Sequence, residues 1–172
     1  MARFTQYPIA SKGDYADATT FLIANIDGEV KQASLDGLMT NYGSDIRSAS
    51  LLIPSADVLQ LNTTPQTIVS AQGAGKVIEV VSAFADIDFN SAAYATNTNM
   101  YIQSATATAP QGLTTINSTV SQINRFRLDQ AGGAALTQIL ENQDLQITVA
   151  TGDPTAGDSD ITVYVIYRVV TL

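Results

Sequence analysis

The chain of 172 residues contains no cysteine, no histidine and no tryptophan. Without cysteine it has neither a disulfide framework nor a thiolate metal site. Without histidine it lacks the commonest general base near neutral pH and the commonest transition-metal ligand, which excludes Ser-His-Asp and Cys-His catalysis. Carboxylates, lysine, tyrosine and hydroxyl groups are the side chains left for chemistry. Carboxylate-pair hydrolysis is therefore the main enzymatic option.

Positive charge is also scarce. Lysine and arginine total 8 against 16 acidic residues, which gives a net charge of −8. Phosphate backbones are bound by clustered lysines and arginines, and the tightest pair here is Arg125 and Arg127. On a strand, these two side chains would simply share one face, either solvated or between subunits. No apolar run is long enough to cross a bilayer. We therefore expect neither nucleic acid nor a membrane as a partner.

Residues 1–47 differ from the rest of the chain. After an irregular start, two short strands, 21–24 and 29–33, flank a turn that contains Asp-Gly, which is a strong hairpin signal. Ser34 is then a good N-cap for one short helix. A hairpin with one small helix is too little to fold alone, so we expect this segment to attach the chain to a partner or a neighbouring subunit. The candidate contact residues are Phe4, Tyr7, Phe21 and Leu38.

From residue 48 onward the sequence predicts short strands separated by turns. The expected strands are 49–53, 66–70, 76–85, 99–104, 145–151 and 161–170, with a helical turn over 54–59 and weak alternation over 117–128. Many short strands with no long helix between them predict a mainly β fold. We therefore expect residues 48–172 to form an antiparallel β-sandwich of the jelly-roll kind. The last two strands, joined by a polar loop, are expected to pair as antiparallel neighbours.

The last predicted strand, 161–170, is apolar on both of its faces. An antiparallel sandwich normally exposes one face of each strand to water. A strand of this kind belongs either at a subunit seam or at the buried centre of the fold, and the pattern favours both equally. The candidate seam residues are Tyr164, Ile166, Tyr167 and Val170.

The run Gly73-Ala74-Gly75-Lys76 looks like the end of a phosphate-binding P-loop. The full motif requires an earlier glycine where Ser70 stands and a Ser or Thr where Val77 stands. A strand also follows where a helix should begin. We interpret this run as a turn between strands.

Two groups of carboxylates are candidate sites. Asp86 and Asp88 would lie on one face of a strand, and Asp153, Asp158 and Asp160 share a polar loop. Calcium takes oxygen ligands of this kind. A solvated strand end and ordinary loop chemistry explain the same residues. We expect no metal, no cofactor and no catalytic residue.

One stretch carries a family resemblance. It runs from Leu52 to Val80 and includes Leu59-Gln60-Leu61-Asn62-Thr63-Thr64-Pro65 and Gly73-Ala74-Gly75-Lys76. It resembles a segment of small structural proteins of tailed bacteriophages, in which an L-x-L-N-x-T-P turn precedes a strand, a G-A-G-K turn and a long strand. The loop that contains Ala93-Tyr94 is similar to an A-Y element of the same proteins. Residues 17–38 resemble a short module near the N-termini of phage appendage proteins.

The resemblance implies a non-enzymatic virion protein, made in the cytoplasm of a bacterial host. Such proteins are capsid decoration, cement or head-fibre proteins, or the bases of tail fibres. They are usually homotrimers, and they bind other phage structural proteins such as the major capsid protein. The resemblance implies no catalytic residue and no cofactor.

Two alternatives stay open. A tail-fibre or receptor-binding module would use the loops 89–99 and 152–160 to bind a cell-surface glycan, with Tyr94 or Asp158 among its contacts. A carboxylate-pair glycosidase would use Asp86 and Asp88 or the acids of the C-terminal loop. The first aspartate pair shares one strand, whereas a glycosidase pair must flank its substrate.

Overall fold

A computed structural model describes residues 21–26, 29–34, 46–128 and 137–172, with the backbone alone over the first two ranges. The chain divides into two units, residues 1–45 and 46–172. The second unit begins two residues before the boundary expected from the sequence, because Ile46 and Arg47 already pair with the last strand.

In the first unit, β1 (Phe21–Ile26) and β2 (Glu29–Ser34) form the predicted hairpin. They are antiparallel, with Phe21 opposite Ser34 and Ile26 opposite Glu29. The helix expected after Ser34 lies outside the described residues, as do the candidate contacts Phe4, Tyr7 and Leu38.

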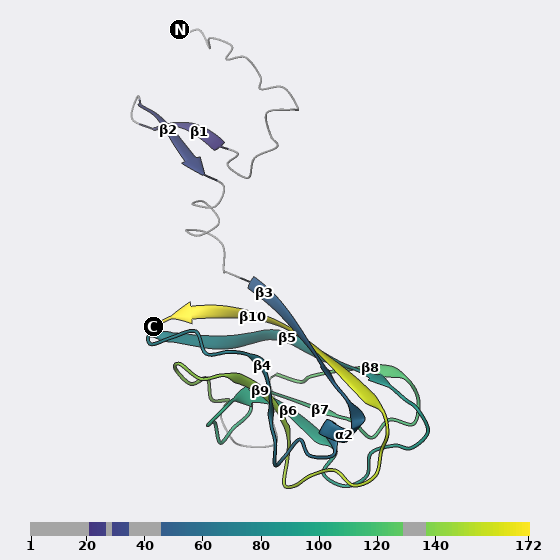
Figure 1. The fold of residues 1–172 in the computed structure, drawn as a ribbon. Helices are drawn as coiled ribbons and strands as arrows, with labels where there is room; N and C mark the ends of the chain where they lie inside the picture. The colour runs from purple at the N-terminus through teal and green to yellow at the C-terminus, as the bar shows by residue number, and fades with distance from the viewer. Residues whose placement is uncertain (1–20, 27–28, 35–45, 129–136) are drawn as a thin grey trace. The chain divides into compact units, whose positions relative to one another are not determined.

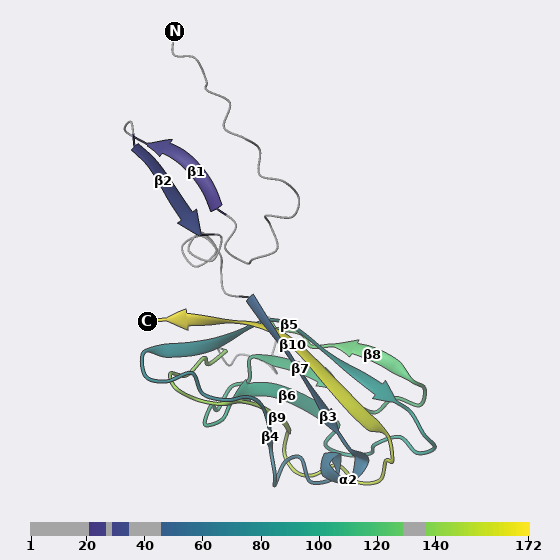
Figure 2. The same cartoon turned by 45° about the horizontal axis from the view of Figure 1, so that its top comes forward.

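The regular secondary structure described in the second unit is almost entirely β-strand (Figure 1). In chain order its elements are β3 (Ile46–Ile53), α2 (Ser55–Val58), β4 (Gln66–Val69), β5 (Lys76–Asp88), β6 (Asn99–Ser104), β7 (Gly112–Thr115), β8 (Gln122–Arg125), β9 (Leu145–Val149) and β10 (Asp160–Thr171). The single turn of α2 follows Pro54 and joins β3 to β4 at one end of the unit (Figure 2). The sequence predicted this helical turn and most of the strands, but it missed β7, which is only four residues long.

The strands form two four-stranded antiparallel sheets, which confirms the predicted β-sandwich. One sheet has the order β3-β10-β5-β8 and the other the order β4-β9-β6-β7. The first strand therefore pairs with the last, the second with the seventh, the third with the sixth and the fourth with the fifth. This is the pairing of one long hairpin that has been wrapped around a core.

The expected pairing of the last two strands is wrong. β9 lies between β4 and β6, and β10 lies between β3 and β5 in the other sheet. The loop between them crosses from one sheet to the other. It is held there by Ala95 and Thr155, whose backbones exchange two hydrogen bonds of 2.8 Å. Alternation identifies the two faces of a strand but not its neighbour, because any two strands of period two can pair.

The core lies between the two sheets. Alternate residues of β10, Ile161, Val163 and Val165, are at most 1% exposed. They face buried side chains of the second sheet, such as Met100 and Ile147. Each buried aliphatic side chain of this size stabilises the fold by about 1.5–3 kcal/mol. The two-residue period of the strands is thus enough to define the inner face of each sheet.

The two sheets are joined along the β7–β8 side. Leu113 of β7 and Arg127 exchange backbone hydrogen bonds of 3.0 and 2.8 Å. The buried side chain of Gln111 accepts a hydrogen bond from Val80 N–H and donates one to the carbonyl of Ile78. The Gln111 amide therefore bonds to the backbone of β5 at Ile78 and Val80, beyond the part of β5 that pairs with β8. Buried backbone groups need such partners.

No helix in the part of the chain that the structure describes has the length and apolar character to span a bilayer.

Candidate functional site

Two surfaces of the second unit hold the candidate residues: the loop end near α2 and the outer face of the β3-β10-β5-β8 sheet. At the loop end, Asp158 is the most heavily bonded carboxylate. It accepts hydrogen bonds from the hydroxyl and the N–H of Ser91, from the N–H of Ala92 and from the side-chain amide of Asn90. These bonds, the Ser91 hydroxyl first, lower the pKa of Asp158 to about 2.

The other two loop acids hold different segments. Asp153 accepts hydrogen bonds from the N–H groups of Asn62 and Thr63 and from the Thr63 hydroxyl, and the Thr63 N–H contributes most to lowering its pKa. Asp160 accepts a bond of 2.8 Å from the N–H of Ser55, at the start of α2. Each carboxylate therefore fixes a separate piece of backbone to the 150–160 loop.

Tyr94 lies under this loop rather than on its surface. Its side chain is 3% exposed, and its hydroxyl donates a 2.5 Å hydrogen bond to the carbonyl of Ser159. Burial raises its pKa. Gly157, whose φ is +95°, packs directly on the Tyr94 ring, where a methyl group would collide with it. The glycan contact considered for Tyr94 is therefore corrected: the residue belongs to the core.

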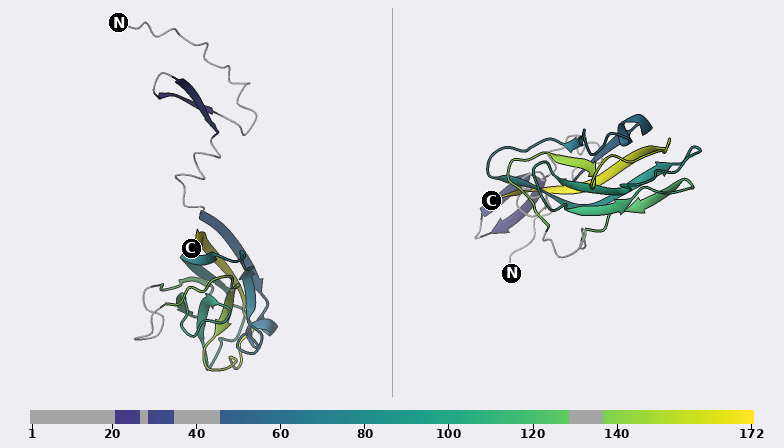
Figure 3. Two further views of the ribbon diagram at one scale, coloured as in Figure 1. Left: turned by 90° about the vertical axis from the view of Figure 1, so that its left-hand side faces the viewer. Right: turned by 90° about the horizontal axis from the view of Figure 1, so that it is seen from below.

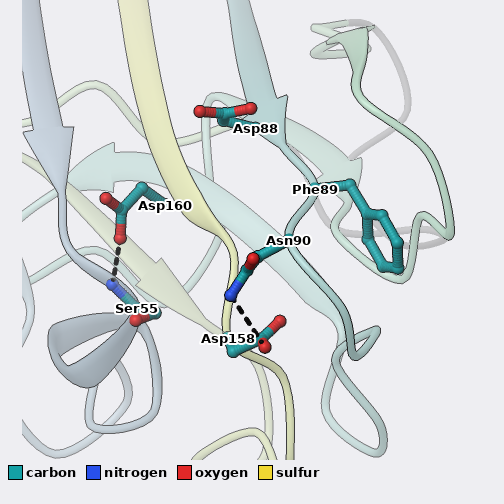
Figure 4. Close-up of a pocket in the computed structure, with 6 residues that line it drawn as sticks. All are labelled: Ser55, Asp88, Phe89, Asn90, Asp158 and Asp160. Atoms are coloured by element: carbon teal, nitrogen blue, oxygen red, sulfur yellow. Dashed lines mark hydrogen bonds between the residues drawn. The ribbon is translucent and has the colours of Figure 1, made fainter.

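A polar hollow opens between these loops (Figure 4). It is lined by Ser55, Asp88, Phe89, Asn90, Asp158 and Asp160. Both oxygens of Asp158 accept hydrogen bonds from the protein, including the one from Asn90, and one oxygen of Asp160 accepts the bond from Ser55 (Figure 4). Within the described ranges, no three acidic residues are arranged to hold a metal ion. The hollow is built as a set of loop attachments.

The outer face of the β3-β10-β5-β8 sheet is apolar at its centre. One row across the sheet consists of Ser50, Tyr164, Phe84 and Arg125. The rings of Phe84 and Tyr164 are stacked, with centroids 5.2 Å apart. Tyr164 and its neighbour along the strand, Ile166, are 38% and 37% exposed.

That centre carries a shallow groove, and charged residues lie beyond it along the strands, including Asp86 and Asp88 of β5. The groove is lined by Ser48, Ala49, Ser50, Phe84, Tyr164, Val165 and Ile166. Toward the C-terminus of β10, Arg168 forms an ion pair with Glu79. Leu52 of β3 is 59% exposed and lies on the same outer side, opposite Thr162. An apolar centre bordered by polar groups is typical of a surface that other proteins cover.

The structure separates the four candidate seam residues. Tyr164 and Ile166 lie on the exposed outer face. Tyr167 is 8% exposed and belongs to the core cluster, and Val170 is half-buried. Phe84 was missed as a candidate. Its alternation with buried Ala83 and Ala85 marks it as outward-facing, but only the pairing of β5 with β10 places it beside Tyr164.

The remaining motifs have structural roles. Gly73 and Gly75 have φ of +95° and +73°, and β5 begins at Lys76, so this run is the predicted turn between strands. Arg125 is exposed on β8, and Arg127 bonds to β7 through its backbone.

No protein-family model matches the chain, and no curated protein matches it. Among solved structures, a chain of the cyanophage Pam1 capsid asymmetric unit aligns with 74% of this chain and 86% of its own length. The two are 16% identical, with a TM-score of 0.37.

The contact between Gly157 and Tyr94 gives a first prediction. Gly157→Ala should lower the free energy of unfolding by about 2–4 kcal/mol, because the methyl group adds overpacking to an unfavourable φ. Gly73→Ala is the matched control: Gly73 has the same φ of +95°, but a methyl group there would meet no atom within 4 Å. It should cost about 1 kcal/mol. Urea unfolding measures both, and equal losses would contradict the role assigned to Tyr94.

The lowered pKa of Asp158 gives a second prediction. Because its folded value of about 2 lies below its ordinary value of 3.8, it stabilises the fold above about pH 4, and this contribution disappears as the pH falls toward 2. Asp158→Asn should lower the melting temperature at pH 6 and flatten its decline between pH 5 and pH 2. Asp57→Asn, which also removes one exposed carboxylate, is the control for the loss of a single negative charge. If the melting temperature of Asp158→Asn falls between pH 5 and pH 2 as steeply as that of the wild type, Asp158 does not stabilise the fold in this way.

Proposed function

We propose that this chain is a non-enzymatic structural protein of a tailed-phage virion and that it works as a homo-oligomer. The observation that carries the proposal is the exposed apolar centre of the outer sheet face, formed by Tyr164, Ile166 and Phe84. Monomeric proteins rarely leave a contiguous apolar patch uncovered, because removing it from water is favourable. In a homo-oligomer, other copies of the same chain cover such a patch.

The charge distribution supports contact between copies. The chain carries a net charge of −8, which makes two copies repel each other. The row through the centre of the outer face contains Arg125 and no acid, and the acids of that side, such as Asp86 and Asp88, lie farther along β5. Apolar and aromatic residues with few charges are typical of the centre of protein interfaces.

The bonding at the loop end supports a structural rather than a catalytic role. Asp153 and Asp158 accept hydrogen bonds through both of their oxygens, and Asp160 accepts one from the backbone N–H of Ser55. A general acid or base needs a carboxyl that faces a substrate. Here the carboxylates stabilise loops that no regular secondary structure holds.

The strand order supports the virion assignment by analogy. A long hairpin wrapped into two sheets is the arrangement of a jelly roll, which viral capsid proteins and lectins use. Fold alone does not define function, but the resemblance of residues 52–80 to structural proteins of tailed phages points the same way. More specifically, we propose that the chain is a homotrimeric capsid decoration or head-fibre protein that binds the major capsid protein.

Jelly-roll domains also occur in lectins, so a glycan-binding tail-fibre module is the second candidate. The exposed hydroxyls of Thr96 and Thr155, 2.9 Å apart, would be its contacts. Binding on a glycan array that Thr155→Ala weakens would favour this candidate over the first.

The outer face gives the third prediction. Replacing Tyr164 and Ile166 together by threonine, which keeps the strand propensity of both positions, should reduce the assembled mass toward 18.2 kDa. The measurement is light scattering over a dilution series. Val120→Thr removes another exposed apolar side chain, on the β7–β8 connection, and should leave assembly unchanged. Wild-type protein that is monomeric at every concentration would rule out assembly through this face in solution.

The separation of the chain into two units gives the fourth prediction. Deleting residues 1–45 leaves β3 and the complete sandwich, so the truncated chain should still assemble. It should no longer bind phage particles that lack the protein, because the attachment segment is gone. Co-sedimentation with such particles measures binding, with the full-length chain as the control. A truncated chain that still decorates the particles would overturn the attachment role of the first unit.

A further inference from the structure

The four border strands of the sandwich differ in how well they are protected. β8 and β4 are four residues long, and the register of β4 with β9 shifts between Thr67 and Val69. β7 is equally short, and Leu113 at its outer side is bonded to Arg127. Short strands, shifts in register and covered borders all prevent a further strand from adding to a sheet.

Strand β3 has none of these protections in the part of the chain that the structure describes. It spans Ile46–Ile53, contains no proline and pairs with β10 in one unbroken register. The backbone hydrogen bonds described for these residues are those of its ladder with β10. The left view of Figure 3 shows β3 along the border of its sheet, beside β10. A long, regular border strand is a template for strand addition.

The sequence of β3 is complementary to itself. When two copies meet antiparallel across a two-fold axis, outward-facing residues must lie opposite outward-facing residues. In the register that places Ala49 opposite Ala49, Ile46 faces Leu52 and Ser48 faces Ser50. Apolar residues then pair with apolar ones, and small ones with small ones. No like charges are opposed, because β3 contains no acid and its one basic residue, Arg47, lies opposite Leu51.

We propose that β3 pairs with the β3 of a second copy, antiparallel and in this register. The two four-stranded sheets then become one continuous sheet, and the exposed side chains of Ile46 and Leu52 cover each other at the join. Because the pair is isologous, it closes after two copies. One short strand from each copy is far less than the 20–30 residues a side of a standard interface, so the contact is weak and forms where copies are concentrated.

This contact is distinct from coverage of the outer face, and it holds whether or not the chain is a virion protein. The wild-type chain contains no cysteine, so single cysteines report on it cleanly. An equimolar mixture of Ser48→Cys and Ser50→Cys should form mixed disulfide dimers under mild oxidation, in excess over the dimers that each variant forms alone. Thr115→Cys, on the border strand β7, is the control and should cross-link no more than random collision allows.

Charge substitution tests the same register without oxidation. Ser48→Glu with Ser50→Glu places two glutamate pairs across the seam and should weaken pairing about tenfold. Ser48→Lys with Ser50→Glu places a lysine opposite each glutamate and should restore or strengthen it. Both variants change only exposed positions, so folding is not at stake. Because Ser48 and Ser50 also line the groove on the outer face, both variants are compared in a chain in which Tyr164 and Ile166 are already threonine. Light scattering at high protein concentration measures the association.

The results of these experiments distinguish which segment or partner pairs with the edge of β3. Preferential mixed cross-links that persist when Tyr164 and Ile166 are replaced by threonine establish β3 pairing as a contact of its own. Equal cross-linking in the mixed and the single samples overturns the proposed register. Association that is indifferent to both charge variants means that another segment or partner covers β3, and it refutes the proposal.

Discussion

The central position of β10 is the constraint on which the rest of the structure depends. This strand pairs with β3 on one side and with β5 on the other, and its alternate residues build the core. The buried set is small and β-branched, with Val163 and Val165 almost inaccessible to water. The opposite set, Tyr164 and Ile166, remains exposed because no element that the structure describes in the second unit covers that side. One strand therefore contributes both to the core and to an exposed apolar surface.

The loop end shows how a chain without disulfides or long helices orders its connections. Asp153, Asp158 and Asp160 each bind N–H groups of a segment distant in sequence, and the buried Tyr94 hydroxyl binds the carbonyl of Ser159. Charge-assisted hydrogen bonds are stronger than neutral ones, and each satisfies a donor that would otherwise lack a partner. These acids resemble a metal or catalytic site in the sequence because loop attachment and metal binding require the same oxygen-rich side chains.

An outer sheet face and a border strand offer different kinds of contact. The face presents side chains, so its specificity depends on the packing of groups such as Phe84 and Tyr164. The border presents backbone donors and acceptors, so its specificity depends on which residues of β3 lie opposite each other. For a chain with a net charge of −8, contact through β3 brings no carboxylate of that strand against another, because β3 contains no acid.

The sequence by itself determined the class of fold, most of the strands and their inner and outer sides. A strand has a period of two, so the alternation around Val163 or in the turn-bounded run 99–104 can be read without any partner. Only the tertiary structure decided which strands are neighbours, and the expected pairing of β9 with β10 was wrong for that reason. It also decided that Tyr94 is buried, that Tyr167 faces the core and that Phe84 stacks on Tyr164. Those outcomes depend on register between distant segments, and register arises when the whole core packs at once.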